Sequence, residues 1–399
     1  MRTSSLYLLA CAETVLSASL GESINFEKRQ LGGLIGGLTN AGYGKVADPP
    51  GHAPRKEELK SPMSIPGVTI KRVKIRAGPY KVPDMGTKSV TGHSGMLESY
   101  YDPTVQKPCD GDCSILQQVG GLEYTNGTNA NIDTGMWLHH MVHFNTGARR
   151  WDPVGRDWTI CLPHLGFGSS PSRSERYFVT GNERTPFHYY READKTAYHL
   201  DPADKFTYLV ELMNMNMAPQ TVYVTMTYDI IEGALPTGWK EIKTVFLDAD
   251  SCRTSEVRPP KEKGSFDISS KPWKPSVEGK IIDAIGHLHD GGVGLDIKAT
   301  TSGPFCSFDA KYSEKPEYVF RGMDMKGDKT AKDHISSMAG CSTPQDYKVP
   351  MMSKSQSWTI KGSYDYDKKE GNLEGGKQSE VMAIAILLVA VPPGPLKPV

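Results

Sequence analysis

The chain has 399 residues, which is too long for one small core and predicts two domains. Lys plus Arg and Asp plus Glu both number 46, so the formal net charge is zero. This balance argues against partners such as nucleic acid or an anionic membrane, which a strongly basic chain would favour. The 40 Gly and 28 Pro favour many turns between short strands over long helices.

The first 20 residues have the pattern of a cleaved secretory signal peptide. Arg2 supplies positive charge, an apolar run begins at Leu6, and small residues cluster at positions 17–19. The apolar run is too short to span a bilayer, which needs roughly 20 residues. We therefore expect a secreted, extracellular protein with no membrane anchor.

The next two segments precede the expected fold. Residues 21–29 form a possible propeptide, because they end in Lys28-Arg29, a dibasic pair of the kind that processing proteases cut. Residues 30–62 are rich in Gly, Pro and Lys. We expect them to form an irregular N-terminal lead-in.

Strand-like runs recur from Val68 to the end of the chain. Residues 68–75 alternate apolar and basic side chains with period 2, and residues 207–212 and 221–228 are β-branched and aromatic. We find no convincing amphipathic helix of more than two turns. These patterns predict an all-β fold with two β-sandwich domains.

The domain boundaries follow from composition. The linker is placed at a stretch rich in Pro and charged residues. The last apolar run, at 381–390, is too short to span a membrane, so we expect a buried strand there. The predicted parts are an N-terminal domain, a linker, a C-terminal domain and a Pro-rich tail, at 63–235, 236–275, 276–392 and 393–399.

Six cysteines remain after Cys11, which falls in the signal peptide, and an even count in a secreted chain predicts disulfides. The candidates are Cys109, Cys113, Cys161, Cys252, Cys306 and Cys341. We favour Cys306 with Cys341, which close a local loop, whereas Cys109 and Cys113 could pair with each other or reach elsewhere. The sequon at Asn126 lies in a polar stretch and predicts an exposed glycosylation site.

Five of the eleven histidines lie in two segments about 150 residues apart. In the later segment, His287 and His289 would project from one face of a strand, because residues i and i+2 point the same way. Such a pair at a strand end can chelate one transition metal. The alternative is two exposed histidines near a turn.

The earlier segment holds His139, His140 and His143. Neighbouring residues face opposite ways in a regular strand, so one metal can bind both His139 and His140 only at a strand end or a bulge. His143 lies on the face of His139 and could join it. The alternative is one buried, hydrogen-bonded histidine and two that face solvent.

A third feature is Met382, which follows Glu380 at the start of the last apolar run. A thioether is a soft ligand that favours copper(I) over zinc. Methionine on a core strand usually serves packing, which is the alternative here.

The order of His-His-Met, His-X-His and an acidic residue closely followed by Met resembles the copper type II, ascorbate-dependent monooxygenases. This family includes peptidylglycine α-hydroxylating monooxygenase and dopamine β-monooxygenase. Residues 364–369 and 379–386 are also similar to the plant stress-up-regulated nodulin-19 proteins. The match covers residues 65–392 in order, with dense similarity only at the motifs.

The resemblance implies two jelly-roll β-sandwich domains, each with one copper, that face each other across a solvent-filled cleft. His139 and His140 would bind an electron-transfer copper. His287, His289 and Met382 would bind the copper at which oxygen is activated, and would be the catalytic residues. One or two copper ions are thus expected as cofactor, with ascorbate as a possible reductant.

The chain also departs from the family pattern. The family has a third histidine for its first copper, whereas the segment 205–214 has none and carries Glu211 or Met213 in that region. Histidines that could substitute are His143, which is nearest, and His164, His188 and His199. The substrate contacts of the family have no counterpart that can be placed.

The leading hypothesis is a secreted copper-dependent monooxygenase that hydroxylates an activated C–H bond of an unknown small molecule or peptide. Its main alternative is a non-catalytic extracellular copper-binding or stress protein. A zinc hydrolase is disfavoured, because the chain has no His-Glu-X-X-His motif and a methionine ligand does not suit zinc.

Overall fold

The computed structural model describes residues 42–89, 92–155, 173–250, 255–300, 303–324, 327–341 and 351–392. These residues form 22 strands and two single-turn 3-10 helices, η1 (Ile132–Thr134) and η2 (Pro316–Tyr318), and they contain no α-helix. The prediction of an all-β sandwich fold is confirmed. The expected signal peptide, propeptide and Pro-rich tail, together with Cys161, His164 and Cys252, lie outside the described residues.

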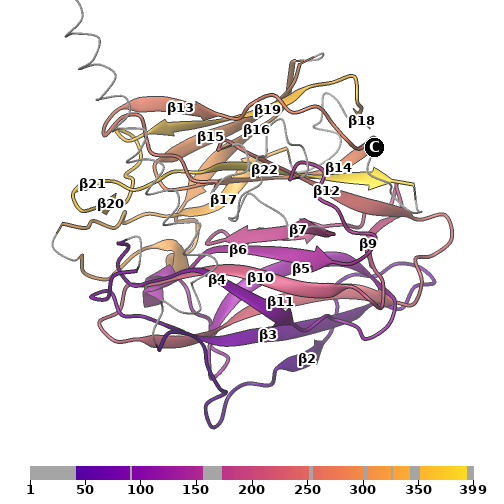
Figure 1. Ribbon diagram of the computed structural model, residues 1–399, viewed down its shortest axis with the longest axis horizontal. Helices are drawn as coiled ribbons and strands as arrows, with labels where there is room; N and C mark the ends of the chain where they lie inside the picture. Colours follow the sequence, from indigo (N-terminus) through magenta and orange to yellow (C-terminus); the bar gives the residue numbers. More distant parts are fainter. Residues whose placement is uncertain are drawn as a thin grey trace, which may run out of the picture.

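The N-terminal half is a β-sandwich, drawn in indigo and magenta in the lower part of Figure 1. One sheet has the order β4 (Met96–Val105), β10 (Lys205–Asn214), β6 (Met136–Thr146) and β7 (Ser174–Gly181). The opposite layer is formed mainly by β3 (Lys71–Val82), β11 (Gln220–Glu232) and β5 (Cys113–Tyr124). Shorter strands at its edges are β1 (Gly44–Lys45), β2 (Lys56–Leu59), β8 (Phe187–His188) and β9 (Thr196–Leu200).

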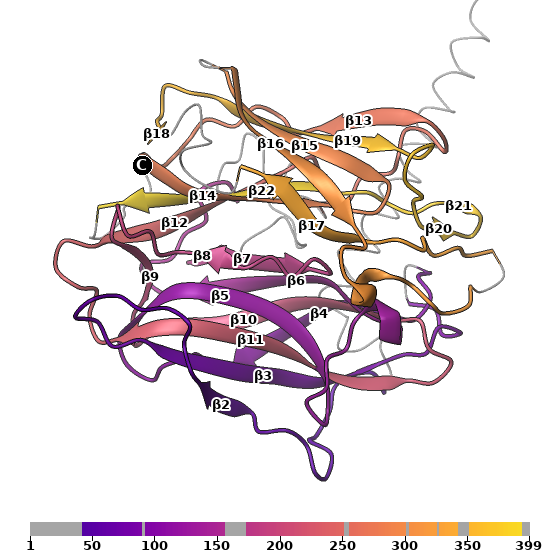
Figure 2. The ribbon, with the colours of Figure 1, turned by 180° about the vertical axis from the view of Figure 1, so that it is seen from behind.

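The C-terminal half stacks above it and also has two layers, as both ribbon views show (Figures 1 and 2). Its outer sheet has the order β13 (Ser265–Ser269), β19 (Trp358–Asp365), β15 (Gly292–Ala299), β16 (Gly303–Tyr312) and β17 (Ile335–Gly340). Its inner layer contains β12 (Lys240–Asp248), β22 (Ala383–Val391), β14 (Gly279–Leu288) and β18 (Met351–Met352). A small hairpin, β20 (Leu373–Glu374) with β21 (Lys377–Gln378), lies beside them.

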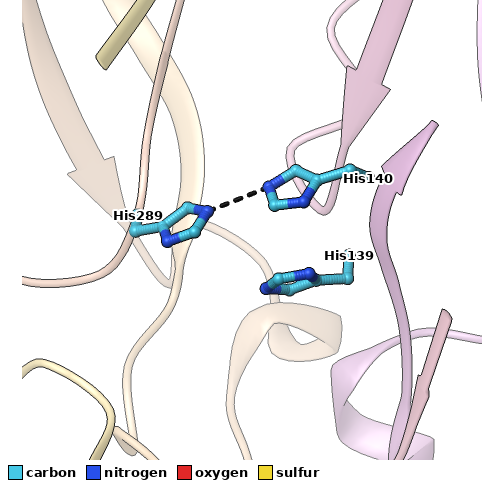
Figure 3. A group of neighbouring side chains, drawn as sticks. All are labelled: His139, His140 and His289. Atoms are coloured by element: carbon cyan, nitrogen blue, oxygen red, sulfur yellow. Dashed lines mark hydrogen bonds between the residues drawn. The ribbon is translucent and has the colours of Figure 1, made fainter. Parts of the chain in front are cut away.

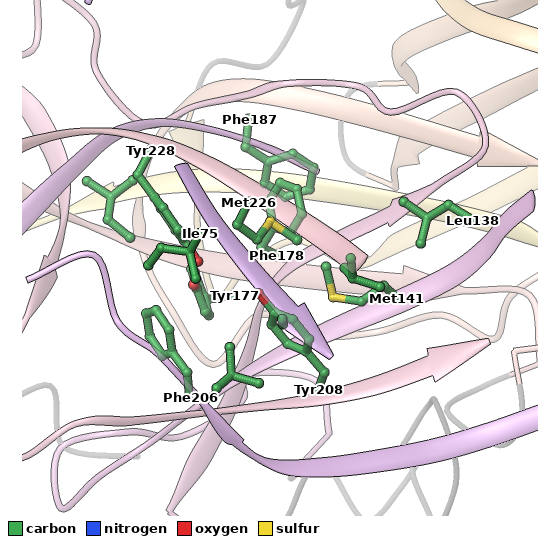
Figure 4. Close-up of a cluster of buried hydrophobic side chains, with 14 of the residues drawn as sticks. Ile75, Leu138, Met141, Tyr177, Phe178, Phe187, Phe206, Tyr208, Met226 and Tyr228 are labelled. Atoms are coloured by element: carbon green, nitrogen blue, oxygen red, sulfur yellow. The ribbon is translucent and has the colours of Figure 1, made fainter. Parts of the chain in front are cut away.

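Strand β22 explains why the last apolar run of the sequence is continuous. Every residue of this strand is buried. Ile384, Ile386 and Leu388 pack into the aromatic-rich core of the N-terminal half, whereas the residues between them pack against the outer C-terminal sheet. A strand covered on both faces needs apolar side chains at every position. Figure 4 shows the N-terminal core, where Tyr177, Phe206 and Tyr208 lie among aliphatic side chains.

The two halves therefore share a core, and β9 pairs with β12 in parallel to join their sheets. This differs from the arrangement that the resemblance implies, with two domains that face each other across a solvent-filled cleft. The inner C-terminal layer is packed directly on the N-terminal half, because one face of β22 is buried there. An open cleft is found beside the ends of β6 and β14.

Two predictions of irregular structure are wrong in part. The predicted linker at 236–275 contains β12 and β13, and β12 pairs with β22 from Glu241 to Asp248. The Pro- and charge-rich composition around residue 260 obscured the buried apolar side chains of β12. The predicted lead-in at 30–62 contains β1 and β2, which pair with β3. The remaining domain boundaries stay predictions.

Two disulfides lie in the described part of the chain. Cys306 pairs with Cys341, as predicted, and Cys109 pairs with Cys113, which was one of the alternatives left open. Asn126 is exposed in a turn, where its Oδ1 accepts hydrogen bonds from Thr128. Among the described residues, no helix is long and apolar enough to cross a membrane.

Candidate metal centre

A β-bulge in β6 turns both neighbouring histidines to one side. In the pairing of β10 with β6, Glu211 lies opposite His140 and Leu212 lies opposite Leu138, so His139 is the extra residue. The ring centroids of His139 and His140 are 4.1 Å apart. Their Nδ1 atoms lie 3.4 and 3.2 Å from the same Glu211 oxygen. The bulge is the local geometry that the sequence required if both histidines were to share a site.

The end of β14 brings the second histidine pair to the same place. His289 Nε2 lies 2.9 Å from His140 Nε2, although the two residues are 149 positions apart in the chain. Figure 3 shows His289 approaching His140 tip to tip, with His139 beside them. One ring nitrogen from each of these three residues lies within 4.8 Å of the other two.

His287 borders this group from the side. Its ring centroid is 5.3 Å from that of His140, and its Nδ1 lies 2.6 Å from Glu183 Oε1. Its Nε2 is buried and has no hydrogen-bond partner among the described residues. Gly181 leaves the room that the ring needs, because a Cβ at this position would lie 3.0 Å from His287 Cε1.

The surroundings of His140 and His289 keep these two imidazoles neutral. Burial, followed by the neighbouring His139, lowers the pKa of His140 to about 3. Burial and the neighbouring imidazoles also hold the pKa of His289 well below its ordinary value. Burial opposes the ionisation of Glu211, but hydrogen bonds from His139 and His140 lower its pKa. Neutral imidazoles beside an ionised carboxylate are the forms that bind a metal cation.

The donor set fits a transition metal. Two bare imidazole nitrogens repel each other, whereas an ion about 2.0–2.1 Å from each would accommodate nitrogens about 2.9 Å apart at nearly a right angle. The buried Nε2 of His287, which has no hydrogen-bond partner among the described residues, offers a further nitrogen ligand. Imidazole suits copper and zinc, so the described residues fit either ion on nitrogen ligands alone.

The prediction that His143 joins His139 is wrong. Beyond the bulge, strand alternation turns His143 into the N-terminal core, away from His140. The side chain is fully buried, and its Nδ1 forms a 2.8 Å hydrogen bond with Tyr177 Oη. Its ring packs edge-on against Phe206 and Tyr208. Its environment is that of a satisfied core histidine.

The structure brings together the histidine pairs that the resemblance assigns to two separate coppers. The histidines assigned to the electron-transfer copper and those assigned to the oxygen-activating copper form one cluster, because His140 and His289 touch. Of the two residues in the region where the family has its third histidine, Glu211 contacts the histidine cluster. Met213 lines the neighbouring cleft. His188 is exposed on β8, and His199 lies beside Ser114 on β5.

Met382 lies on the side of β22 that faces the histidines. It is 1% exposed and, with His140 and His287, lines a small cavity whose other walls include aliphatic side chains such as Ile285. Val381 packs on the opposite side, against the C-terminal core. Alternation along the strand therefore supports Met382 over Val381 as the residue near the cluster.

A larger cleft opens from the other side of the histidines and encloses about 1140 Å³ of atom-free space, open solvent included. Its walls contain groups that the sequence analysis missed, including Trp137, Glu183, Glu256 and His334. Glu256 offers an oxygen within 4.8 Å of ligand atoms of both His140 and Glu211. Glu183, Glu256 and His334 have no motif around them in the sequence, so only the fold reveals their proximity.

The fold and the cluster define an all-β protein with a histidine-rich candidate metal centre between its two halves. The chain is similar to "probable copper-dependent oxygenase M1" from Phoma sp., with 31% identity over 258 residues, which are 64% of this chain and 60% of that protein. It is also similar to "probable copper-dependent oxygenase clz3" from Cochliobolus lunatus, with 32% identity over 194 residues, 48% and 57% of the respective chains.

These similarities relate the chain to proteins named as copper-dependent oxygenases. The chain spans less than two thirds of the length of either relative. No protein-family model matches the sequence.

Proposed function

We propose that this protein is a copper-dependent monooxygenase that inserts oxygen into an activated C–H bond of an organic substrate. The observation that carries the proposal is the 2.9 Å approach of His140 and His289 from the two halves of the chain. The names of the two relatives support copper over zinc. A methionine next to the cluster favours copper as well, because a thioether is a poor zinc ligand.

His139, His140 and His289 would hold one copper ion, with His287 and Met382 at its border. When bound, copper supplies the one-electron chemistry that activates dioxygen, with ascorbate or a similar molecule as reductant. The single ion is our proposal, and it rests on the convergence of both histidine pairs in one place.

The protein's own contribution is to orient the imidazoles. Each ring directs its Nδ1 to an oxygen: Glu211 serves His139 and His140, Glu183 serves His287, and the backbone carbonyl of Glu380 serves His289 at 2.7 Å. An Nδ1–H that donates to oxygen fixes the tautomer and leaves Nε2 as the metal-binding atom. All four histidines are thus prepared in the same way.

The two cavities divide the reactants between them. The wide cleft on one side of His139 has mixed polar and apolar walls and is large enough for an organic substrate. The small cavity on the other side is walled by side chains such as Val179, Ile285 and Ile384, and it ends at His140 and His287. Apolar cavities hold small apolar molecules in preference to water, so we assign this one to dioxygen.

We further propose that the protein is secreted. The N-terminal sequence pattern motivates this location. The two disulfides support it, because disulfides persist in oxidising compartments.

The test is oxygen consumption by the purified, copper-loaded protein in the presence of ascorbate. The wild type should consume oxygen above the background of free copper, and the double variant His140→Ala, His289→Ala should not. His188→Ala is the matched control, because this histidine is exposed on β8. Copper binding without oxygen consumption would support the non-catalytic alternative, and the absence of copper binding would contradict both.

A further inference from the structure

The wide cleft carries recognition groups of its own, apart from the histidine cluster. Four methionines contribute to its wall, and three of them are almost fully buried. They are Met85, Met96, Met213 and Met215. Met85 and Met215 also pack with Trp137 in a separate apolar cluster. Flexible thioether side chains and an indole ring suit an apolar molecule.

His334 is one of the polar side chains that line the cleft. Its Nδ1 lies 2.6 Å from Asp290 Oδ2, and the Asp290 carboxylate also accepts from the Ile335 amide and from Asn372. The Nδ1 atom must therefore carry the proton, which leaves Nε2 of the neutral ring as an acceptor. The side chain is 1% exposed, and its Nε2 has no hydrogen-bond partner within the described part of the chain.

Trp137 also lines the cleft and contacts His334. The indole Nε1–H is buried and likewise lacks a partner among the described residues. The Trp137 and His334 rings meet edge to face, with centroids 4.6 Å apart. A buried donor or acceptor without a partner destabilises the protein, so a ligand that satisfies both recovers that free energy.

The charges in the cleft restrict the ligand further. Among the described residues that line the cleft, Lys329 is the only lysine, and there is no arginine. Its ammonium group pairs with Glu370 at 2.8 Å. The acidic lining residues are more numerous: Glu183, Glu256, Asp290, Asp328, Glu374 and Glu380. A carboxylate or phosphate on the ligand would meet repulsion here.

We propose that the cleft binds a neutral molecule with an apolar body and a hydroxyl group, such as a phenol or an alcohol. The hydroxyl oxygen accepts the hydrogen of Trp137 Nε1, and the hydroxyl hydrogen is donated to His334 Nε2. A hydroxyl is one small group that does both, whereas a carboxylate has no proton to donate. That this molecule is the substrate rests on the proposed function, but its recognition depends only on the cleft.

The test is binding of three probes of similar shape to the metal-free protein by isothermal titration calorimetry. These probes are 2-naphthol, naphthalene and 2-naphthoate. We expect 2-naphthol to bind at least about tenfold more tightly than either of the others, since about 1.4 kcal/mol corresponds to tenfold. Equal binding of 2-naphthoate and 2-naphthol would overturn the proposal.

Trp137→Phe removes the donor and keeps an aromatic ring in the wall. We expect it to weaken 2-naphthol binding about tenfold and to leave naphthalene binding unchanged. Trp273→Phe is the control, because Trp273 Nε1 is also buried without a partner among the described residues, but it lies in the C-terminal core away from the cleft. Unchanged selectivity in Trp137→Phe would contradict the proposal.

His334→Phe provides a second variant, and it should remove the preference for 2-naphthol over naphthalene. Copper binding to the wild type is measured on the same preparation. Selective 2-naphthol binding without copper binding would leave this proposal standing and contradict the proposed function. Copper binding without selective binding of 2-naphthol would leave the proposed function standing and contradict this proposal.

Discussion

Two parts of the same strand, β6, show what separates a candidate metal ligand from a core histidine. His140 and His143 are both buried, and burial lowers the pKa of both. His143 hydrogen-bonds to Tyr177 and is surrounded by aromatic side chains. His140 instead has Glu211 at its Nδ1 and His289 at its Nε2.

Burial and a lowered pKa are therefore not sufficient to identify a ligand. The difference lies in convergence, because imidazoles from two remote strands meet at His140 and a carboxylate orients two of them. The bulge at His139 produces this difference by changing the direction of the side chains along one strand.

His140→Ala should reduce copper affinity more than about 100-fold, because it removes a ligand, and loss of supporting groups alone costs about 10–100-fold. The measurement is competition with a copper chelator of known affinity. His143→Gln is the paired variant, and it should leave copper affinity unchanged. An equal loss in both variants would mean that the two histidines do not differ as proposed.

Glu211→Gln should reduce copper affinity about 10–100-fold, because the neutral amide orients His139 and His140 less firmly and does not balance the charge of the ion. Glu241→Gln is the control, since this residue lies on β12 and pairs with Arg149. The same competition assay measures both variants. Wild-type affinity in Glu211→Gln would show that the carboxylate is not part of the site.

His143 should make the fold sensitive to acid. Burial holds its pKa below the ordinary value of 6.5 in the folded protein, so below that pH the unfolded chain binds a proton that the folded chain does not. This contribution to the free energy of unfolding is therefore fully present above pH 6.5 and lost as the pH falls below it, by at most about 2 kcal/mol between pH 7.5 and 5.

Urea unfolding at both pH values measures this contribution. The metal-free wild type should lose more free energy of unfolding between pH 7.5 and 5 than His143→Gln does, by at most about 2 kcal/mol, since glutamine does not titrate. Equal losses in the two proteins would place the acid sensitivity elsewhere.

Met382→Leu should have the smallest effect. Leucine conserves most of the volume, so the fold should be retained. Copper(I) affinity should fall by up to about tenfold, while copper(II) affinity stays near the wild-type value, because a thioether contributes mainly to copper(I). An unchanged copper(I) affinity would identify Met382 as a packing residue.

Local patterns in the sequence predicted the parts of this account that depend on local geometry. The period-2 runs predicted strands, the uninterrupted apolar run predicted a buried strand at β22, and the His139-His140 pair required a bulge or a strand end. The pairing of Cys306 with Cys341 was also predicted correctly.

The parts that could not be predicted depend on long-range packing. The sequence does not reveal that β14 ends against β6, and it was the resemblance that implied a separate copper for each histidine pair. Glu183 and His334 reach the site through the fold alone, with no motif around them. The face of β22 that carries Met382 also became evident only from the position of the N-terminal core.

The central claim is that both histidine pairs serve one copper centre, and the most direct test is copper stoichiometry in two double variants. Copper per chain is measured by mass spectrometry after removal of unbound metal, in the wild type, in His139→Ala, His140→Ala and in His287→Ala, His289→Ala. One shared centre predicts one copper in the wild type and loss of that copper in either variant. Two coppers in the wild type, with one retained in each variant, would contradict the account.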